Sequence, residues 1–141
     1  MAEVTKTAVN VISFFVAGVP TPQGSVRAFV VKGKPILTSS NKNLADWRRL
    51  VSDVAQQYAC MIEGPVKLNV GFILPRPKSL PKKVQWHLKK PDLDKLVRSV
   101  CDSLTGIMWQ DDSQIVTIQA TKSYAANAES TGVLIEIERR S

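Results

Sequence analysis

Two stretches with apolar residues at helical spacing, set among short runs rich in β-branched residues, most constrain what this chain can fold into. The first stretch runs from residue 41 to about 61, and the second from 92 to 104. Runs typical of strands or of a hairpin occupy residues 11–19, 26–38, 66–75, 114–124 and 133–138. This order predicts an α/β fold of the two-layer α+β type, in which two main helices pack on one mixed β-sheet.

The chain is predicted to form one domain that covers residues 1–141. A length of 141 residues, 44% of them hydrophobic, suffices for a single core. Residues 75–90 interrupt the regular pattern with three prolines, six Lys or Arg residues and no acidic residue. We expect a long, exposed, flexible basic loop there, because loops of this length in compact domains are usually functional or disordered.

Membrane insertion and secretion are not indicated. No apolar run approaches the ~18 residues of a membrane span, and the apolar residues 11–19 are followed by no signal-peptide cleavage site. Cys60 and Cys101 both lie in apolar helical patterns and form no C-x-x-C pair. We expect two reduced core thiols in a cytoplasmic protein that has no membrane partner.

The charge distribution has two opposite features. The formal net charge of +7 points to a polyanionic partner, with nucleic acid ahead of an anionic membrane surface. Within this basic chain, five of the 12 acidic residues lie in one short region: Asp92, Asp94, Asp102, Asp111 and Asp112. A basic protein with such an acidic cluster suggests a metal site beside a nucleic-acid surface.

Asp92 and Asp94 follow Pro91, which keeps the start of the second helix extended. Asp92 can then be the N-cap and Asp94 can lie in the first turn, so that both carboxylates converge. Asp111 and Asp112 lie in a turn from which a third carboxylate could reach the pair. Carboxylates without paired imidazoles or thiols suit Mg²⁺, with Mn²⁺ as a substitute. The alternative for an isolated D-x-D is plain helix capping.

Arg98 stands four residues after Asp94 and four before Asp102, on one helix face. This spacing fits either a surface ion-pair ladder or a guanidinium that stabilises charge on a phosphate. The matching reaction is phosphodiester hydrolysis, with the DNA backbone held by Lys82, Lys83, Lys89 and Lys90. His87 is the only histidine, and we expect it to be a surface residue or a substrate contact rather than a metal ligand.

The motif KPDLDKLVRSVCDSLTG, then DDSQIV, then a strand ending in K-x-Y at residues 122–124, resembles the RusA family of Holliday junction resolvases. The resemblance implies small α/β subunits that form a homodimer and bind four-way DNA junctions. It implies symmetric paired nicks at Mg²⁺-dependent sites without a small-molecule cofactor. A role in DNA recombination and repair follows, in the cytoplasm of a bacterial or phage-infected cell.

The family motif assigns metal binding and catalysis to Asp92, Asp94 and Asp112, with Asp111 as a second ligand or a supporting acid. Arg98 takes the place of a common catalytic lysine and is expected to stabilise the transition state, while Lys95 replaces a usual Asn. The predicted DNA contacts are Arg27, Arg76, Lys82, Lys83, Lys89, Lys90, Lys95 and Lys122. Two alternatives stay open: a nuclease for flaps or other branched DNA, and a branched-DNA-binding protein with weak or lost nuclease activity.

Overall fold

The computed structural model describes the backbone of residues 11–24, 27–31, 34–38 and 42–140, and the side chains of residues 11–24 and 42–140. The elements in chain order are β1 (Val11–Ala17), β2 (Arg27–Val31), β3 (Lys34–Thr38), α2 (Lys42–Gln56), β4 (Val66–Leu74), α3 (Leu93–Leu104), η1 (Asp112–Gln114), β5 (Ile115–Tyr124), η2 (Ala128–Ser130) and β6 (Gly132–Arg139).

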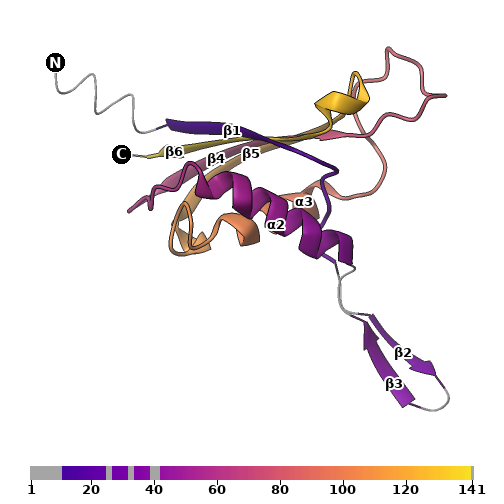
Figure 1. The fold of residues 1–141 in the computed structure, drawn as a ribbon, viewed down its shortest axis with the longest axis horizontal. Helices are drawn as coiled ribbons and strands as arrows, with labels where there is room; N and C mark the ends of the chain where they lie inside the picture. The colour runs from indigo at the N-terminus through magenta and orange to yellow at the C-terminus, as the bar shows by residue number, and fades with distance from the viewer. Residues whose placement is uncertain (1–10, 25–26, 32–33, 39–41, 141) are drawn as a thin grey trace.

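Four of the strands form one mixed sheet in the order β1-β6-β4-β5. The β4 and β5 strands are parallel, whereas β6 is antiparallel to both of its neighbours. Figure 1 shows α2 and α3 packed together against one face of this sheet. The predicted two-layer fold of a mixed sheet and two main helices is therefore confirmed.

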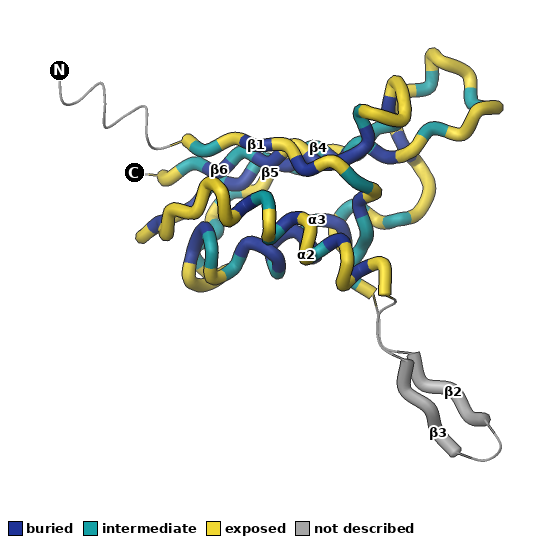
Figure 2. Tube along the Cα trace, viewed as in Figure 1, coloured by how far each residue is buried: buried dark blue, intermediate teal, exposed yellow. Residues whose placement is uncertain are grey.

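The core lies between the sheet and the two helices, where Figure 2 shows buried residues on the facing sides of both layers. Burial alternates along β4, so that one face of the strand turns toward the helices. The helices contribute apolar residues at helical spacing. Buried side chains from β4, α2 and α3 include Leu68, Val70, Phe72, Trp47, Val51, Leu96, Val100 and Leu104.

The first helix is shorter than the sequence pattern predicts. The α2 helix ends at Gln56, and in the turn that follows the Tyr58 N–H bonds to the Ala55 carbonyl at 2.9 Å. Cys60 is therefore exposed, and its expected place in the core is wrong. Cys101 is buried as expected, and burial raises the pKa of its thiol to about 12.

The predicted hairpin is confirmed as β2 and β3, which form a separate two-stranded antiparallel sheet. Arg27, a predicted DNA contact, begins β2. Its side chain lies outside the described ones, so this role stays a prediction.

The crossover from β4 to β5 contains both motifs of interest, since parallel neighbours need a long connection between them. The chain leaves β4 at Leu74, passes through the basic segment 75–90 and enters α3 at the acidic motif. It then returns to β5 through η1. Among the described residues, no helix has the length and apolar character needed to cross a bilayer.

Candidate active site

The carboxylates of Asp92 and Asp94 lie at the start of α3, as predicted. Asp92 is the N-cap, with extended backbone (φ −72°, ψ 140°), and its side chain makes no capping hydrogen bond. Asp94 lies in the first turn and is exposed. A side-chain capping bond is therefore not observed for Asp92, and both carboxylates face solvent where a cation can reach them.

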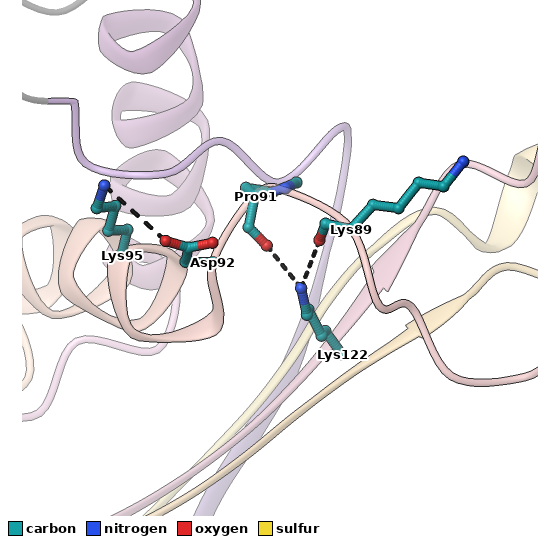
Figure 3. Close-up of polar contacts among 5 residues, drawn as sticks. All are labelled: Lys89, Pro91, Asp92, Lys95 and Lys122. Carbon is teal, nitrogen blue, oxygen red and sulfur yellow. Dashed lines mark hydrogen bonds and ion pairs between the residues drawn. The ribbon is translucent and has the colours of Figure 1, made fainter.

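Lys95 is the ion-pair partner of Asp92, with its Nζ 4.0 Å from the Asp92 Oδ2 (Figure 3). The two side chains are 46% and 52% exposed, so water screens the pair and it contributes little to stability. A predicted DNA contact by Lys95 stays a prediction. Its ammonium group nevertheless lies beside the candidate metal ligand, where it lowers the local negative charge.

Lys122, near the end of β5, holds the segment that leads into the acidic motif. Its Nζ donates hydrogen bonds to the carbonyl oxygens of Lys89 at 2.6 Å and of Pro91 at 2.8 Å (Figure 3). The Lys90–Pro91 peptide between these carbonyls is cis. Since Pro91 directly precedes Asp92, β5 fixes where α3 begins. The DNA contact predicted for Lys122 is untested, and two of its three N–H donors are used within the chain.

Arg76 organises the basic segment from within. Its guanidinium donates to the carbonyl oxygens of Ala125 at 2.8 Å, Pro81 at 2.9 Å and Val84 at 2.7 Å, and it lies 5.5 Å from the centre of the Tyr124 ring. These bonds connect both halves of an irregular segment to the chain after β5. The predicted DNA contact by Arg76 stays a prediction, and the structure gives this residue a supporting role.

The four lysines predicted to hold DNA are exposed along this segment: Lys82, Lys83, Lys89 and Lys90. The segment is irregular, as expected from its prolines. Hydrogen bonds and a short bridge fasten it to β5, including one at 2.9 Å from the Tyr124 N–H to the Gln85 carbonyl. Its predicted flexibility is untested, whereas its attachment to the sheet is observed.

His87 is buried, so the expectation that it is a surface contact is wrong. Its ring packs against Tyr124 with centroids 4.7 Å apart. Burial, together with the positive charge of Lys122, lowers the pKa of the imidazole. The physical reason is the local geometry: side chains alternate across this stretch, so that Trp86 and Leu88 point outward and His87 points inward.

Asp112 is oriented by two hydrogen-bond donors. Its Oδ1 accepts from the Trp109 Nε1 at 2.9 Å and from the Thr105 hydroxyl. Thr105 is the C-cap of α3, and Trp109 is fully buried in the core. The Asp112 carboxylate is thus held in one orientation with its second oxygen available.

Asp111 has a different role from its neighbour. Its side chain caps η1 by accepting a hydrogen bond from the Ser113 N–H at 2.9 Å, and Gln114 completes the capping box. Hydrogen bonding from the Ser113 backbone, and then from its hydroxyl, lowers the pKa of Asp111. The structure therefore gives Asp111 the role of a supporting acid in the turn, and a ligand role stays a prediction.

The structure does not bring Asp112 to Asp92 and Asp94 within one chain. The pair lies at the N-terminal end of α3, whereas Asp112 is bonded to the C-cap Thr105 at the other end. The helix rise over this span is about 16 Å, whereas oxygens on one Mg²⁺ lie within about 4 Å of each other. Among the described residues, no group of three His, Cys, Asp or Glu side chains is placed to hold a metal. Within one chain α3 thus separates the two motifs, and the metal-binding role of Asp112 stays a prediction.

Arg98 is exposed one turn after Asp94. In the described part of the chain it forms no ion pair with Asp94 or Asp102, so the surface ladder is not observed. Its predicted role toward a phosphate is untested.

Sequence reasoning did not identify the residues that position the carboxylates. Thr105 and Trp109 orient Asp112, and Lys122 holds the backbone before Asp92. The one available signal is Trp109, because a tryptophan three residues before an acid in a short turn can donate its indole N–H to that acid.

The candidate site consists of exposed carboxylates at a helix start, flanked by exposed lysines, on a small two-layer α/β fold. A family model described as Endodeoxyribonuclease RusA matches residues 18–138, which include both acidic motifs. The chain belongs to the RusA family of endodeoxyribonucleases, as its motifs indicate.

Two known proteins are similar to this chain. The chain is 32% identical over 126 residues to YqaN of Bacillus subtilis (strain 168), an uncharacterized protein; the match covers 81% of this chain and 88% of YqaN. It is also 38% identical over 74 residues to the crossover junction endodeoxyribonuclease rusA of Lactococcus phage r1t. That second match covers 52% of this chain and 53% of the phage protein.

Proposed function

We propose that this chain is a Mg²⁺-dependent endodeoxyribonuclease that resolves four-way DNA junctions by paired symmetric nicks, as a homodimer. The observation that carries the proposal is the uncapped, exposed pair Asp92 and Asp94 beside exposed Lys89 and Lys90. Family membership and the name of the phage relative support the choice of a DNA junction as substrate. A role in DNA recombination and repair follows from that substrate.

The donor set fits a hard divalent cation. Asp92, Asp94 and Asp112 supply carboxylate oxygens only, which suits Mg²⁺ or Mn²⁺. Such an ion, when bound, polarises a phosphoryl oxygen and lowers the pKa of an attacking water.

The other residues of the site act on the DNA. The guanidinium of Arg98 provides planar donors for a phosphate whose charge increases in the transition state. The exposed lysines of the segment 75–90 hold the flanking backbone.

We infer that a second copy of the chain completes the site. Since α3 separates Asp112 from the Asp92–Asp94 pair, three aspartates can share a metal only if Asp112 comes from the partner. A two-fold axis across α3 places the N-terminal end of one helix beside the C-terminal end of the other. Two such sites are related by the same symmetry as the two strands that a resolvase cuts.

A mixed dimer tests this arrangement directly. Differently tagged Asp94→Asn and Asp112→Asn subunits are combined, and the purified mixed dimer is compared with both mutant homodimers on a synthetic four-way junction in Mg²⁺. Each homodimer has two broken sites and should not nick. In the mixed dimer, one site combines Asp92 and Asp94 of one subunit with Asp112 of the other, so single-strand nicks should return.

Two outcomes would contradict the proposal at different levels. An inactive mixed dimer, beside an active wild type, would place all three aspartates in sites within one chain. A wild-type protein that nicks no junction in either Mg²⁺ or Mn²⁺ would remove the nuclease function itself.

The Asp92–Lys95 ion pair favours a second candidate function. A lysine beside a candidate ligand opposes metal binding, and a branched-DNA-binding protein with weak or lost nuclease activity follows from that. Tight junction binding without nicks would support it. Comparing flaps with four-way junctions separates a flap nuclease from a resolvase.

A further inference from the structure

Trp86 and Leu88 expose large apolar surfaces near the C-terminal end of the basic segment 75–90. Trp86 is 55% exposed and Leu88 is 89% exposed, the largest exposed fraction of any large apolar side chain that the structure describes. An exposed leucine alone is ordinary, but two neighbouring apolar side chains on the same side of one strand-like stretch form a surface that water disfavours.

The backbone that carries both side chains is fastened on either side. Before them, the Tyr124 N–H bonds to the Gln85 carbonyl at 2.9 Å, and Trp86 itself bridges to Ser123. Between them, His87 is buried against Tyr124. After them, the Lys122 Nζ bonds to the Lys89 carbonyl at 2.6 Å (Figure 3). Trp86 and Leu88 therefore project outward from a held backbone.

The charges around the pair favour DNA over protein as the occupant. Residues 75–90 contain six Lys or Arg and no acid, and Lys89 and Lys90 directly follow Leu88. A second copy of this surface would bring lysines against lysines, which costs free energy. A strand of DNA offers both a negative backbone and flat apolar base faces, and lysines combined with an aromatic ring suit such a strand.

We propose that Trp86 and Leu88 contact the unstacked bases at the branch point of the DNA. This inference rests on the proposed function and names the feature of the substrate that is recognised. In continuous duplex the base faces are covered by stacking, whereas a branch point exposes them. The pair therefore distinguishes branched DNA from duplex, while the lysines bind both.

The position of the pair also relates the branch point to the cut. Leu88 precedes Asp92 by four residues, so their Cα atoms lie at most about 14 Å apart. This equals about four base-pair steps of ~3.4 Å along one strand. The contact thus places the scissile phosphate within a few nucleotides of the branch.

The test compares wild type with the double variant Trp86→Ala/Leu88→Ala, the single variant Trp86→Phe and the control Met61→Ala. Met61 is 49% exposed and lies outside the basic segment, so it is a matched apolar truncation. Binding of a fluorescent four-way junction and of a linear duplex is measured without divalent metal. The double variant should lose about fivefold to 100-fold in junction affinity, the range for loss of a base–aromatic stack.

Duplex affinity should change by less than about twofold in the double variant, because the lysines that make phosphate contacts are intact. Trp86→Phe should keep most of the preference for the junction over the duplex, and Met61→Ala should keep all of this preference. A second readout uses 2-aminopurine at the branch: wild type should change its fluorescence, and the double variant should not. Both side chains are exposed, and thermal melting checks that each variant is folded.

The outcomes separate this inference from the proposed function. If wild type prefers and nicks junctions while the double variant keeps the same junction-to-duplex ratio, the inference fails and the function stands. Equal loss on junction and duplex also overturns it, as does a change in oligomeric state with unchanged DNA binding. If wild type itself does not prefer or nick junctions, the proposed function fails.

Discussion

The neighbouring residues Asp111 and Asp112 offer a test of the site one carboxylate at a time. Asp111→Asn should keep nicking close to wild type, because an Asn oxygen can also accept the Ser113 N–H. Asp112→Asn should lose more than the roughly 10–100-fold that removal of a supporting partner costs at a metal site. Initial rates of junction cleavage over a Mg²⁺ titration provide the measurement. Equal losses in both variants would make Asp111 a ligand as well.

Lys122 is predicted to position the acidic motif. Lys122→Met should lower the cleavage rate at saturating junction roughly 10–100-fold, because Pro91 before Asp92 loses its anchor. Junction affinity should stay within about twofold, since two of the three ammonium donors already bond to backbone.

The control for Lys122 is the exposed Lys82. Lys82→Met should weaken binding, reduce the salt dependence by about 0.9 in log–log slope and leave the saturated rate unchanged. The opposite pattern for Lys122→Met, weaker binding with a normal rate, would restore its predicted role as a DNA contact.

The two cysteines should differ in reactivity. Cys101 is buried with a thiol pKa of about 12, so its thiolate is scarce at neutral pH, whereas Cys60 is exposed. Iodoacetamide should therefore modify Cys60 alone in the folded protein and both cysteines in urea, as peptide mass spectrometry can show. Rapid native labelling of Cys101 would mean that α3 opens easily.

Among the elements, those with the clearest periodicity were predicted best. The second helix and the strand at β4 match the sequence pattern closely, because each has one apolar face against the core. The first helix ends early because Tyr58 leaves it and stacks on Phe14 with ring centroids 5.0 Å apart. The turn before η1 contains the core residues Met108 and Trp109. Sequence reasoning did not identify them, because two residues are too few to show the spacing of a helix or a strand.

The close pairing of β1 and β6 predicts a position where only glycine fits. A Cβ at Gly132 would overlap the Val16 carbonyl oxygen and the Phe15 ring. Gly132→Ala should therefore lower the free energy of unfolding by about 1–3 kcal/mol.

The matched control is Gly71→Ala on β4, where a Cβ would meet the Thr121 hydroxyl at an ordinary 3.7 Å. It should change the free energy of unfolding by less than about 1 kcal/mol. Urea unfolding of both variants checks the pair, and a mild effect at Gly132 would show that β1 can move away from β6.

At the scale of the whole molecule, His87 should make stability depend on pH. Its pKa is lower in the folded state than in the unfolded chain, so the unfolded state binds more protons. This contribution is complete above the unfolded pKa of about 6.5 and is lost as the pH falls through it toward the lower folded value.

Thermal or urea unfolding between pH 5 and 8 should show wild type losing stability toward acid more steeply than His87→Gln. The difference between the two proteins isolates His87 from the carboxylates, which titrate in both. Parallel curves would mean that the pKa of His87 does not differ between the folded and unfolded states.

Whether the three aspartates of the candidate site come together also depends on the whole molecule. Sequence reasoning therefore missed the separation of Asp112 from the Asp92–Asp94 pair. The motifs carry the right residue types, and local rules place Asp92 and Asp94 correctly at a helix start. Whether Asp112 reaches them depends on the length of α3 and on where its far end packs. Such relations come from the three-dimensional arrangement, which spacing along a sequence does not contain.

The hydrogen bond from Lys122 of β5 to the Pro91 carbonyl before α3 also affects the stage of synthesis at which the chain can cut DNA. Lys122 is synthesised 30 residues after Asp92. A chain still emerging from the ribosome therefore contains Asp92 and Asp94 before it contains the lysine that bonds to the Pro91 carbonyl. The edge strand must dock beside β4 before that anchor reaches the Pro91 carbonyl. Synthesis order thus delays cutting competence until β5 has docked beside β4, and products of translation that end before Lys122 lack it.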